Sequence, residues 1–388
     1  MYNIKTLNNI APVGLSKLDP KKYNVGSDVE NPIGILVRSA NMHDMELGED
    51  LLCISRAGAG TNNIPVDKCA EKGIVVFNSP GANAQAVKEL ALCALFISSR
   101  NIIAGIDWVR SIADQGDEIP KMVEKGKNAY VGPEIAGKKL GVIGLGAIGA
   151  KIANTALSLG MKVYGYDPYL SVDAAWSLSS NVIHATEVDT IYEECDYITL
   201  HIPYLESTRH FINKEALSKM KQNVRIINIA RGELVNDDDM IEAIDCGKVA
   251  CYVTDFPNAK TANVPNIIAI PHLGASTPES EDNCAVMAAR ELRDYIENGN
   301  ILHSVNMPTA VMPRNGDPRI CMIHKNIPDM IAQITKNLSA HGVNIENMVN
   351  SGRKGKPYAY TMIDVDKVSD EVIHAVKNIE GIIRFRVV

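Results

Sequence analysis

Several features are missing from this sequence, and each absence argues against a class of protein. No apolar run approaches the roughly 18 residues that a membrane-spanning helix needs, and the N-terminal residues MYNIKTLNNI lack the apolar segment of a signal peptide. There is no run of basic residues and the formal net charge is −7, so we expect neither nucleic acid nor an anionic membrane as a partner. No stretch is low in complexity. We therefore expect a folded cytoplasmic protein.

Paired cysteines are missing too. The eight cysteines are scattered along the chain and form no CxxC pattern. This spacing argues against a disulfide framework and against a cysteine metal site, so we predict buried thiols in a reducing compartment and no bound metal. At 388 residues, the chain is long enough for two or three domains with ample core.

The stretch around which the rest is organised is KLGVIGLGAIGAKIANTALSLGMKVYGYD, residues 139–167. An apolar strand leads directly into a GxGxxG pattern, and a helical pattern, a second strand and Asp167 follow. In such a unit Gly144 permits a tight turn, Gly146 lets a pyrophosphate approach the backbone, and Gly149 lets helix and strand pack closely. The helix N-terminus adds free N–H groups and the positive end of a dipole.

The acid at the end of this stretch distinguishes a dinucleotide site from a glycine-rich structural turn. Asp167 follows Gly149 by 18 residues, where a carboxylate can bind ribose hydroxyls. Pro168, Tyr169 and Leu170 come next, and none of them is an arginine that could hold a 2′-phosphate. The sequence therefore predicts NAD, rather than NADP, as the cofactor.

The whole pattern predicts an α/β protein with two doubly wound, Rossmann-like parallel-sheet lobes and a C-terminal βαββαβ ferredoxin-like module. Short apolar strands alternate with helices both before and after the dinucleotide unit. We predict a substrate-binding domain at 1–95, completed by 286–308, and an NAD-binding domain at 96–285. A Pro- and Gly-rich linker at 309–316 precedes the module at 317–388.

Polar residues follow the strands of both predicted lobes, at the edge where open α/β sheets bind ligands. Arg38 and Ser39 close one strand of the first lobe. Small residues around Gly58 close the next strand and would expose backbone N–H groups to an anion. An ordinary loop with solvated arginines explains these residues equally well.

Arg231 and His272 end neighbouring strands in the predicted NAD-binding lobe. Oxidation of a 2-hydroxy acid needs a cation for the carboxylate, and arginine supplies a bidentate fork. It also needs a base for the hydroxyl proton, and histidine titrates near neutral pH. A helix-capping arginine and a structural histidine would explain each residue alone, but the pair within a nucleotide-binding lobe favours catalysis.

The segments RAGAGTNNI, VVFNSPGANAQAVKEL, GLGAIG, LHIP, NIARGELVN and PHLGAST extend this pattern along nearly the whole chain. Together they resemble the D-2-hydroxyacid dehydrogenase family, and the C-terminal module is similar to an ACT domain. The resemblance implies oxidation of 3-phosphoglycerate to 3-phosphohydroxypyruvate, the first committed step of serine synthesis. It makes Arg231 the anchor of the substrate carboxylate and His272 the acid/base.

The resemblance also implies roles for other residues. Arg38 and Ser39 would contact the substrate, and the Gly58 loop would lie near its carboxylate. His324, Asn326 and Asn344 resemble residues that hold L-serine as a feedback inhibitor. We also expect a homo-oligomer, because the edge strands of the C-terminal sheet need a cover. The residues that would line NAD, besides the three glycines of the GxGxxG pattern, are Ser79, Ala147, Ile148, Asp167, Ile202, Ile229, Ala230, Asp255, Gly274 and Ala275.

Two positions depart from the family pattern. The family reads DVFxxEP after the fifth strand of its nucleotide lobe, and its Glu pairs with the catalytic His, whereas this chain reads TDFPNAK. Alignment on Phe256 places Ala259 at the Glu position, and alignment on Asp255 places Lys260 there, so neither supplies a carboxylate. In the C-terminal module Asp329 replaces a usual Gly, which would change the loop because Gly alone tolerates positive φ freely.

Two other functions remain open. A dehydrogenase for a different 2-hydroxy acid would use the same residues, although Arg38 favours a phosphorylated substrate. A non-catalytic NAD sensor or corepressor on the same fold belongs to another class. The presence of both Arg231 and His272, together with an amino-acid-binding module, argues against it.

Overall fold

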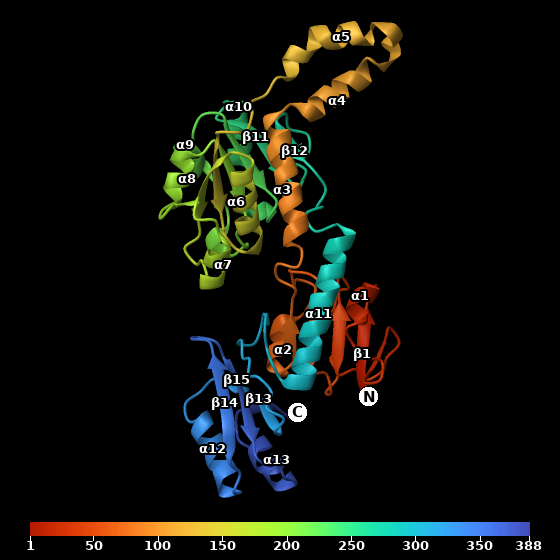
Figure 1. The fold of residues 1–388 in the computed structure, drawn as a ribbon, viewed down its shortest axis with the longest axis vertical. Helices are drawn as coiled ribbons and strands as arrows, with labels where there is room; N and C mark the ends of the chain where they lie inside the picture. The colour runs from red at the N-terminus through yellow and green to blue at the C-terminus, as the bar shows by residue number, and fades with distance from the viewer. The chain divides into compact units, whose positions relative to one another are not determined.

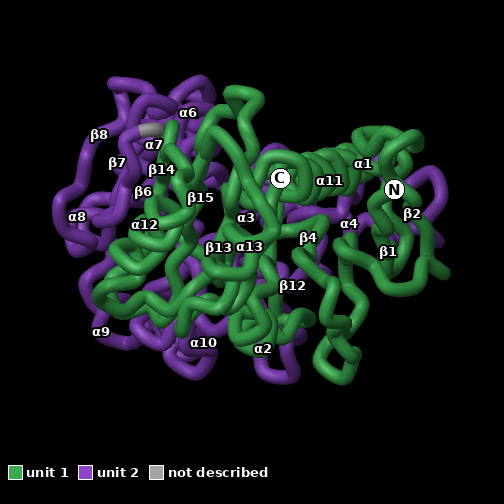
Figure 2. The backbone as a smooth tube through the Cα atoms, turned by 90° about the horizontal axis from the view of Figure 1, so that it is seen from below, with its two compact units in different colours: residues 1–83, 278–388 green, residues 84–277 purple. Residues whose placement is uncertain are grey.

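The computed structural model describes residues 1–172 and 174–388 in full, and the chain separates into two compact units (Figure 2). The first unit consists of residues 1–83 and 278–388, and the second of residues 84–277. The chain passes from one unit to the other at the starts of two long helices, Ala84–Ser99 and Pro278–Asn298, and each helix belongs wholly to one unit. The boundaries therefore lie 12 residues (95 − 83) and eight residues (285 − 277) before those predicted from the sequence.

The first unit begins with a parallel five-stranded sheet in the order β2-β1-β3-β4-β5. Two of its three inner strands, GILV at 34–37 and CISR at 53–56, are almost wholly buried, which explains their largely apolar sequences. The strands are β1 (Tyr2–Leu7), β2 (Tyr23–Gly26), β3 (Gly34–Val37), β4 (Cys53–Arg56) and β5 (Val75–Phe77), and the helices are α1 (Pro12–Leu15), α2 (Val66–Glu71) and α11 (Pro278–Asn298).

Helix α11 is the longest in this unit, and it returns the chain to the first sheet (Figure 1). Its acidic residues Glu279 and Glu281 stand in the first turn, where the helix dipole favours negative charge. Its buried residues, among them Leu292 and Tyr295, pack with Phe77 in the core of the unit. The helix therefore connects the edge of the sheet with the C-terminal part of the chain.

The C-terminal residues form the predicted βαββαβ arrangement, an antiparallel sheet in the order β14-β15-β13-β16. Two helices cover one face (Figure 1), where Met322 and Ile363 meet Ile334 and Val376. The elements are β13 (Arg319–Lys325), α12 (Met330–Ala340), β14 (Ile345–Gly352), β15 (Tyr358–Val365), α13 (Asp370–Lys377) and β16 (Ile382–Val387).

The other face of this C-terminal sheet packs against the first lobe. Ile323, Tyr360 and Met362 belong to the same buried core cluster as Phe77 and Tyr295. The segment 309–316, which we predict as a linker, also takes part, because Ala310 and Met312 are buried in this cluster. The sheet is therefore apolar on both faces for a structural reason: one face meets its own helices and the other meets the rest of the unit.

Two arginines of the C-terminal sheet bind the end of α11. Arg319 is fully buried, pairs with both carboxylate oxygens of Asp364 at 2.6 and 2.9 Å, and donates to the Asn298 carbonyl at 2.9 Å. Arg386 donates to the carbonyls of Tyr295 and Ile296, and its guanidinium lies 4.1 Å from the centroid of the Tyr295 ring. These bonds reach carbonyls of the last turn, which have no partners within the helix; that of Tyr295 also accepts from the Gly299 N–H at 3.0 Å.

Asp329 precedes α12 in the left-handed conformation, with φ 70°. The substitution of aspartate for glycine therefore does not remove the positive φ that a glycine would adopt most easily. Aspartate is one of the few non-glycine residues that visit this region routinely. The expectation that the loop would change for lack of glycine is not met at this residue.

The second unit is the predicted doubly wound lobe, a parallel seven-stranded sheet in the order β12-β11-β10-β9-β6-β7-β8. Separate apolar cores lie on its two faces. Its strands are β6 (Lys139–Ile143), β7 (Lys162–Tyr166), β8 (Ile183–His184), β9 (Tyr197–Leu200), β10 (Val224–Asn228), β11 (Val249–Thr254) and β12 (Ile267–Ala269). Its helices are α3 (Ala84–Ser99), α6 (Ala147–Ser158), α7 (Val172–Ser177), α8 (Val188–Glu194), α9 (Lys214–Lys219) and α10 (Asp237–Asp245), with short 3-10 turns at Glu206–Thr208 and Gly232–Leu234.

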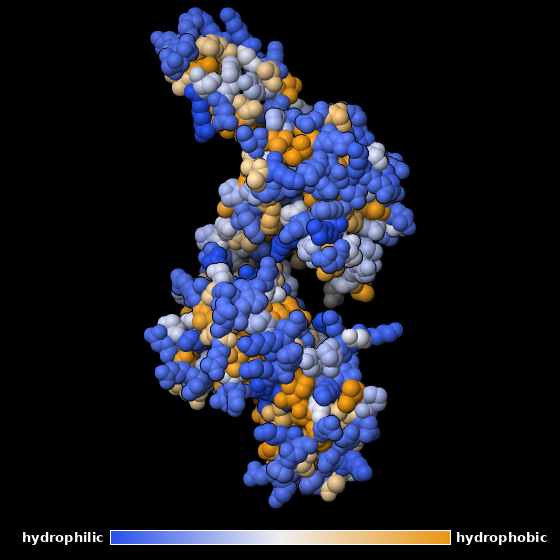
Figure 3. All heavy atoms as spheres, turned by 180° about the vertical axis from the view of Figure 1, so that it is seen from behind, coloured by the Kyte–Doolittle hydropathy of each residue, from blue (hydrophilic) through white to orange (hydrophobic). Residues whose placement is uncertain are grey.

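A helical hairpin that the sequence reading missed lies between α3 and β6. It consists of α4 (Ile102–Ser111) and α5 (Ile119–Gly126), with 3-10 turns at Ala113–Glu118 and Lys127–Tyr130. Neither helix has a buried residue, and apolar side chains are visible on its surface at the top of Figure 3. Among the described residues no single helix is long and apolar enough to cross a membrane, and α3 and α4 pass such a test only as a pair bent by 66°.

The cysteines are free thiols, but not all of them are buried as predicted. Cys93 and Cys246 are exposed, whereas the other six are buried. Burial raises the pKa of the buried thiols, for example that of Cys53 to about 12, so these thiols stay protonated and unreactive.

The buried ion pair gives a test of how the C-terminal sheet is held. Arg319→Met leaves the Asp364 carboxylate buried without its cation, and we expect a loss of about 3–5 kcal/mol in the free energy of unfolding, measured by urea titration. Arg353→Met, at an exposed position between β14 and β15, is the control. The double variant Arg319→Met/Asp364→Leu should recover most of the loss; an unchanged urea midpoint for Arg319→Met would contradict this account.

Candidate active site and cofactor site

The glycines of the GxGxxG pattern have the geometry that their predicted roles require. Gly144 has φ 91°, and a Cβ atom there would lie 2.6 Å from the His201 carbonyl oxygen. A Cβ atom at Gly149 would lie 1.8 Å from the Gly144 carbonyl oxygen, so only glycine allows this close approach of helix and strand. A Cβ atom at Gly146 would meet nothing within 4 Å, which leaves open space beside the backbone there.

The start of α6 has free N–H groups beside this turn. Gly146 is the N-cap residue and offers no side-chain hydrogen bond, so the first N–H groups of the helix, at Ala147 and Ile148, stay available to an anion. Asp167 follows β7, the neighbour of β6. Its Oδ2 accepts from the Leu145 N–H at 2.9 Å and its Oδ1 from the Tyr169 N–H at 2.9 Å, so the carboxylate is fixed next to the glycine turn.

The strand order places a topological switch point at this edge. Strands β6 and β9 are neighbours, and from them the chain winds outwards to β8 on one side and to β12 on the other. Ligands of open α/β sheets bind at such a point, outside the carboxyl ends of the strands. The predicted NAD-lining residues that follow these strands are Ile202 after β9, Ile229 and Ala230 after β10, Asp255 after β11, and Gly274 and Ala275 after β12.

Arg231 and His272 follow β10 and β12 and share one neighbour, Phe256. The Phe256 and His272 ring centroids are 4.5 Å apart, and the Arg231 guanidinium lies 5.9 Å from the Phe256 centroid. The His272 side chain is exposed. Phe256 was not predicted as a site residue, although its position directly after Asp255 at a strand end was a usable signal.

Asn228 is a second residue that sequence reasoning missed. It is fully buried, its Nδ2 donates to the Arg231 carbonyl at 2.8 Å, and its Oδ1 accepts from the Ala230 N–H at 3.2 Å. The side chain thereby closes the turn after β10. Arg231 Nη1 donates to the Ala230 carbonyl at 2.6 Å, so both the backbone and the guanidinium of Arg231 are held in place.

Lys260 and Asp255 belong to the segment in which the family has the Glu that pairs with its catalytic His. Lys260, one of the two aligned candidates, forms an ion pair with Asp238 at 2.7 Å and is exposed. Asp255 is fully buried, and neither of its carboxylate oxygens has a hydrogen-bond partner among the described residues. Burial raises the pKa of the Asp255 carboxyl, and the charge of His272, the nearby backbone N–H groups of Gly274 and of Asp255 itself, and the charge of Arg231 oppose that shift. Asp255 is thus an acid whose charge interacts with His272.

The substrate candidates lie at the corresponding edge of the first unit. Arg38 follows β3, and its Nη2 binds the Glu281 carboxylate at 2.5 Å. The Ser39 N–H donates to Asn8 Oδ1 at 2.9 Å, so Ser39 is held by its backbone. Gly58 has φ 153°, and a Cβ atom there would lie 2.7 Å from Arg56 Nη1, so glycine leaves room for that guanidinium.

Ser79, predicted to line NAD, is fully buried in the first unit. Its hydroxyl lies 2.9 Å from the Arg56 carbonyl and 3.1 Å from the Cys284 carbonyl, so the two carbonyls share its one proton as acceptors. These contacts join β4 to α11. In this structure the Ser79 hydroxyl is therefore occupied by contacts within the protein.

The three predicted effector residues stand in β13, directly after β13 and directly before β14. His324 lies in the inner strand β13, is buried, and bonds through Nε2 to Thr361 Oγ1 and through Nδ1 to the Lys325 carbonyl, each at 2.8 Å. Burial lowers its pKa and favours the neutral ring. Asn326 donates to the carbonyl of Lys356 at 3.1 Å.

Asn344 borders a hollow. The hollow has a volume of about 640 Å³ and lies between α12 and the start of β14, where Lys336, Thr335 and Ser339 also line it. The Asn344 side chain is exposed and donates to Glu346 Oε1 at 2.6 Å. The hollow therefore offers one cation and several hydrogen-bonding groups.

Comparison with known proteins extends the resemblance. Residues 92–274 match the family model described as D-isomer specific 2-hydroxyacid dehydrogenase, NAD binding domain. The chain is 38% identical over 259 residues to a hydroxypyruvate reductase of Thermotoga maritima, covering 64% of this chain and 79% of that protein. It is 30% identical over 371 residues to D-3-phosphoglycerate dehydrogenase of Escherichia coli (strain K12), covering 91% of this chain and 86% of that protein.

A third relative is longer than this chain. D-3-phosphoglycerate dehydrogenase of Methanocaldococcus jannaschii is 32% identical over 318 residues, or 80% of this chain, and the match spans only 58% of that protein's length.

Solved structures share the fold at lower identity. A cofactor (NAD+)-bound 3-phosphoglycerate dehydrogenase of Entamoeba histolytica superposes with a TM-score of 0.61 at 24% identity, covering 79% of this chain and 98% of that one. D-mandelate dehydrogenase of Rhodotorula graminis gives 0.66 at 21% identity, covering 78% and 97%. The chain therefore belongs to the D-isomer specific 2-hydroxyacid dehydrogenase family, and its second unit carries the NAD-binding domain of that family.

Proposed function

We propose that this protein oxidises 3-phosphoglycerate to 3-phosphohydroxypyruvate with NAD, as the first step of L-serine biosynthesis. The observation that carries the proposal is the placement of Arg231 and His272 against one aromatic ring, Phe256, at the edge of the nucleotide-binding sheet. A fixed cation and an accessible imidazole are the two groups that oxidation of a 2-hydroxy acid requires.

The residues present fit NAD. The open backbone at Gly146 and the uncapped start of α6 suit a pyrophosphate, and Asp167 suits the ribose hydroxyls. Asp255 has two buried oxygens that lack donors, and a carboxamide of the kind that nicotinamide carries would supply N–H groups to them. When bound, NAD accepts the hydride from the substrate carbon.

The protein's own groups account for the remaining steps. Arg231 binds the substrate carboxylate and orients it, with donors that remain beyond the one bonded to Ala230. His272 takes the proton from the C2 hydroxyl as the hydride leaves. Asp255 adds a carboxyl whose charge interacts with that of His272.

The phosphorylated substrate is supported by Arg38 at the edge of the first sheet and by the names of several relatives, including the one from Escherichia coli. The second candidate is a dehydrogenase or reductase for another 2-hydroxy acid, since the relative from Thermotoga maritima is named for hydroxypyruvate. Arg231 and His272 argue against a non-catalytic NAD sensor.

We propose further that L-serine binds the C-terminal module and inhibits the enzyme. The hollow beside Asn344 supports this idea, because Lys336 can bind a carboxylate and the amide and hydroxyl groups can bind an amine or a hydroxyl. The buried His324 would act through the fold of the strand rather than by contact.

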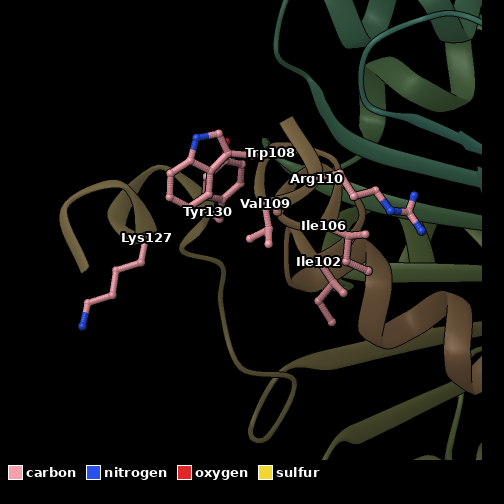
Figure 4. A pocket seen from close by; sticks show the side chains of 8 residues that line it. Ile102, Ile106, Trp108, Val109, Arg110, Lys127 and Tyr130 are labelled. Carbon is pink, nitrogen blue, oxygen red and sulfur yellow. The ribbon is translucent and has the colours of Figure 1, made fainter. Parts of the chain in front are cut away.

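We propose that the protein is a homo-oligomer and that the α4–α5 hairpin contributes the interface. Ile102, Ile106 and Val109 recur at helical spacing and are 46%, 45% and 44% exposed. They line a hollow of about 420 Å³ beside the stacked rings of Trp108 and Tyr130 (Figure 4). A hairpin without a buried core gains most from a second copy of itself.

The proposed activity is tested by NADH absorbance with 3-phosphoglycerate, D-glycerate and D-lactate. We expect the highest kcat/KM with 3-phosphoglycerate. His272→Ala should lower kcat by about 10²-fold or more, since positioned acid–base catalysis contributes that much. Arg231→Lys should also be severe, because an ammonium cannot reproduce bidentate binding. Preference for an unphosphorylated acid would favour the second candidate, and full activity of either variant would remove that residue from the mechanism.

The proposed regulation is tested by titrating L-serine into the assay. We expect inhibition that Asn344→Ala abolishes, with turnover in the absence of serine unchanged. Asn347→Ala, in the strand that directly follows Asn344 but not among the residues that line the hollow, serves as the control. Calorimetry that detects no serine binding at millimolar concentration would reject the effector site.

The proposed interface is tested by sedimentation velocity. Ile106→Asp places a charge in the apolar stripe, so we expect a shift to smaller particles, whereas Gln115→Asp at the exposed end of the hairpin should leave the size unchanged. Identical sedimentation of the unmodified protein and Ile106→Asp would exclude this hairpin as the interface.

A further inference from the structure

The guanidinium of Arg38, the cation proposed to meet the substrate's phosphate, already has an acidic partner. Arg38 Nη2 and Glu281 Oε1 are 2.5 Å apart, and the two side chains are 41% and 43% exposed. Glu281 stands in the first turn of α11, where free N–H groups and the helix dipole favour a carboxylate. Both residues belong to the first unit.

The backbone around Arg38 is held while its side-chain end stays accessible. The Arg38 carbonyl accepts from Arg56 Nε at 3.0 Å and from Asn63 Nδ2 at 3.4 Å. Glu281 is the acidic side chain that pairs with Arg38 among the described residues. An anion that reaches this guanidinium must therefore either displace the Glu281 carboxylate or bind beside it.

We infer that Glu281 is a specificity-determining residue, which sets how strongly the site prefers a substrate with a phosphorylated tail over one with a neutral tail. The inference rests on the proposed function, in which Arg38 meets the substrate. The Glu281 carboxylate offsets part of the positive charge of the Arg38 guanidinium. A phosphate at Arg38 is therefore attracted less strongly by the guanidinium and is also repelled by the carboxylate. A neutral hydroxyl at the same position meets no such repulsion.

The substitution Glu281→Gln isolates the charge. Glutamine keeps the length of the side chain and an oxygen acceptor for the guanidinium, and its NH₂ group can donate to a phosphate oxygen. Glu279→Gln is the matched control, because Glu279 is an exposed acid in the same turn and has no ion pair among the described residues.

The experiment compares 3-phosphoglycerate with D-glycerate, which carries a hydroxyl in place of the phosphate. We expect Glu281→Gln to lower KM for 3-phosphoglycerate by about three- to fivefold, the upper part of the range for a half-exposed charge interaction. The effect should appear in KM more than in kcat, and it should shrink at high salt. KM for D-glycerate and both constants of Glu279→Gln should stay within about twofold.

Calorimetric binding of both acids separates failure of this inference from failure of the proposed function. If Glu281→Gln binds 3-phosphoglycerate more tightly and D-glycerate equally well, the role of Glu281 stands. If the unmodified protein then turns over neither acid, the proposed activity is wrong although the role of Glu281 stands. An equal change for both acids, no change, or weaker binding of 3-phosphoglycerate would overturn the inference.

Discussion

The structure of the first unit depends on how the end of α11 is bound. The last carbonyls of a helix have no partners within the helix, and here Arg319 and Arg386 from the C-terminal sheet supply them. Arg319 is fully buried and can be so only because Asp364 pairs with it. As a result, the C-terminal βαββαβ segment shares a core with the first lobe and does not stand apart from it.

The same helix carries a second set of contacts at its other end. α11 has 21 residues, so it spans about 30 Å at 1.5 Å per residue, and its first turn presents Glu281 to Arg38. One rigid element therefore links the C-terminal sheet to the cation proposed to recognise the phosphate. An effector could use this link only if it binds two states of the unit with different affinity, and the shared core is where such a difference would arise.

Much of the fold could be predicted because local patterns determine it. The glycines at 144, 146 and 149 and the acid at 167 specify a turn, a helix start and a ribose site within one short segment, and the geometry confirms the turn. The contact between Arg38 and Glu281 could not be predicted, since the residues are 243 positions apart and nothing local pairs them. Nor could the burial of His324, because an apolar strand pattern does not say how many faces of a sheet are covered.

The central claim is that the groups gathered at the edge of the seven-stranded sheet serve hydride transfer from C2 of a phosphorylated 2-hydroxy acid to NAD. The most direct measurement uses 3-phosphoglycerate deuterated at C2, with NMR of the reduced cofactor. The account predicts deuterium at C4 of the nicotinamide ring and 3-phosphohydroxypyruvate as the product. Reduced cofactor without deuterium, or no reduced cofactor at all, would contradict it.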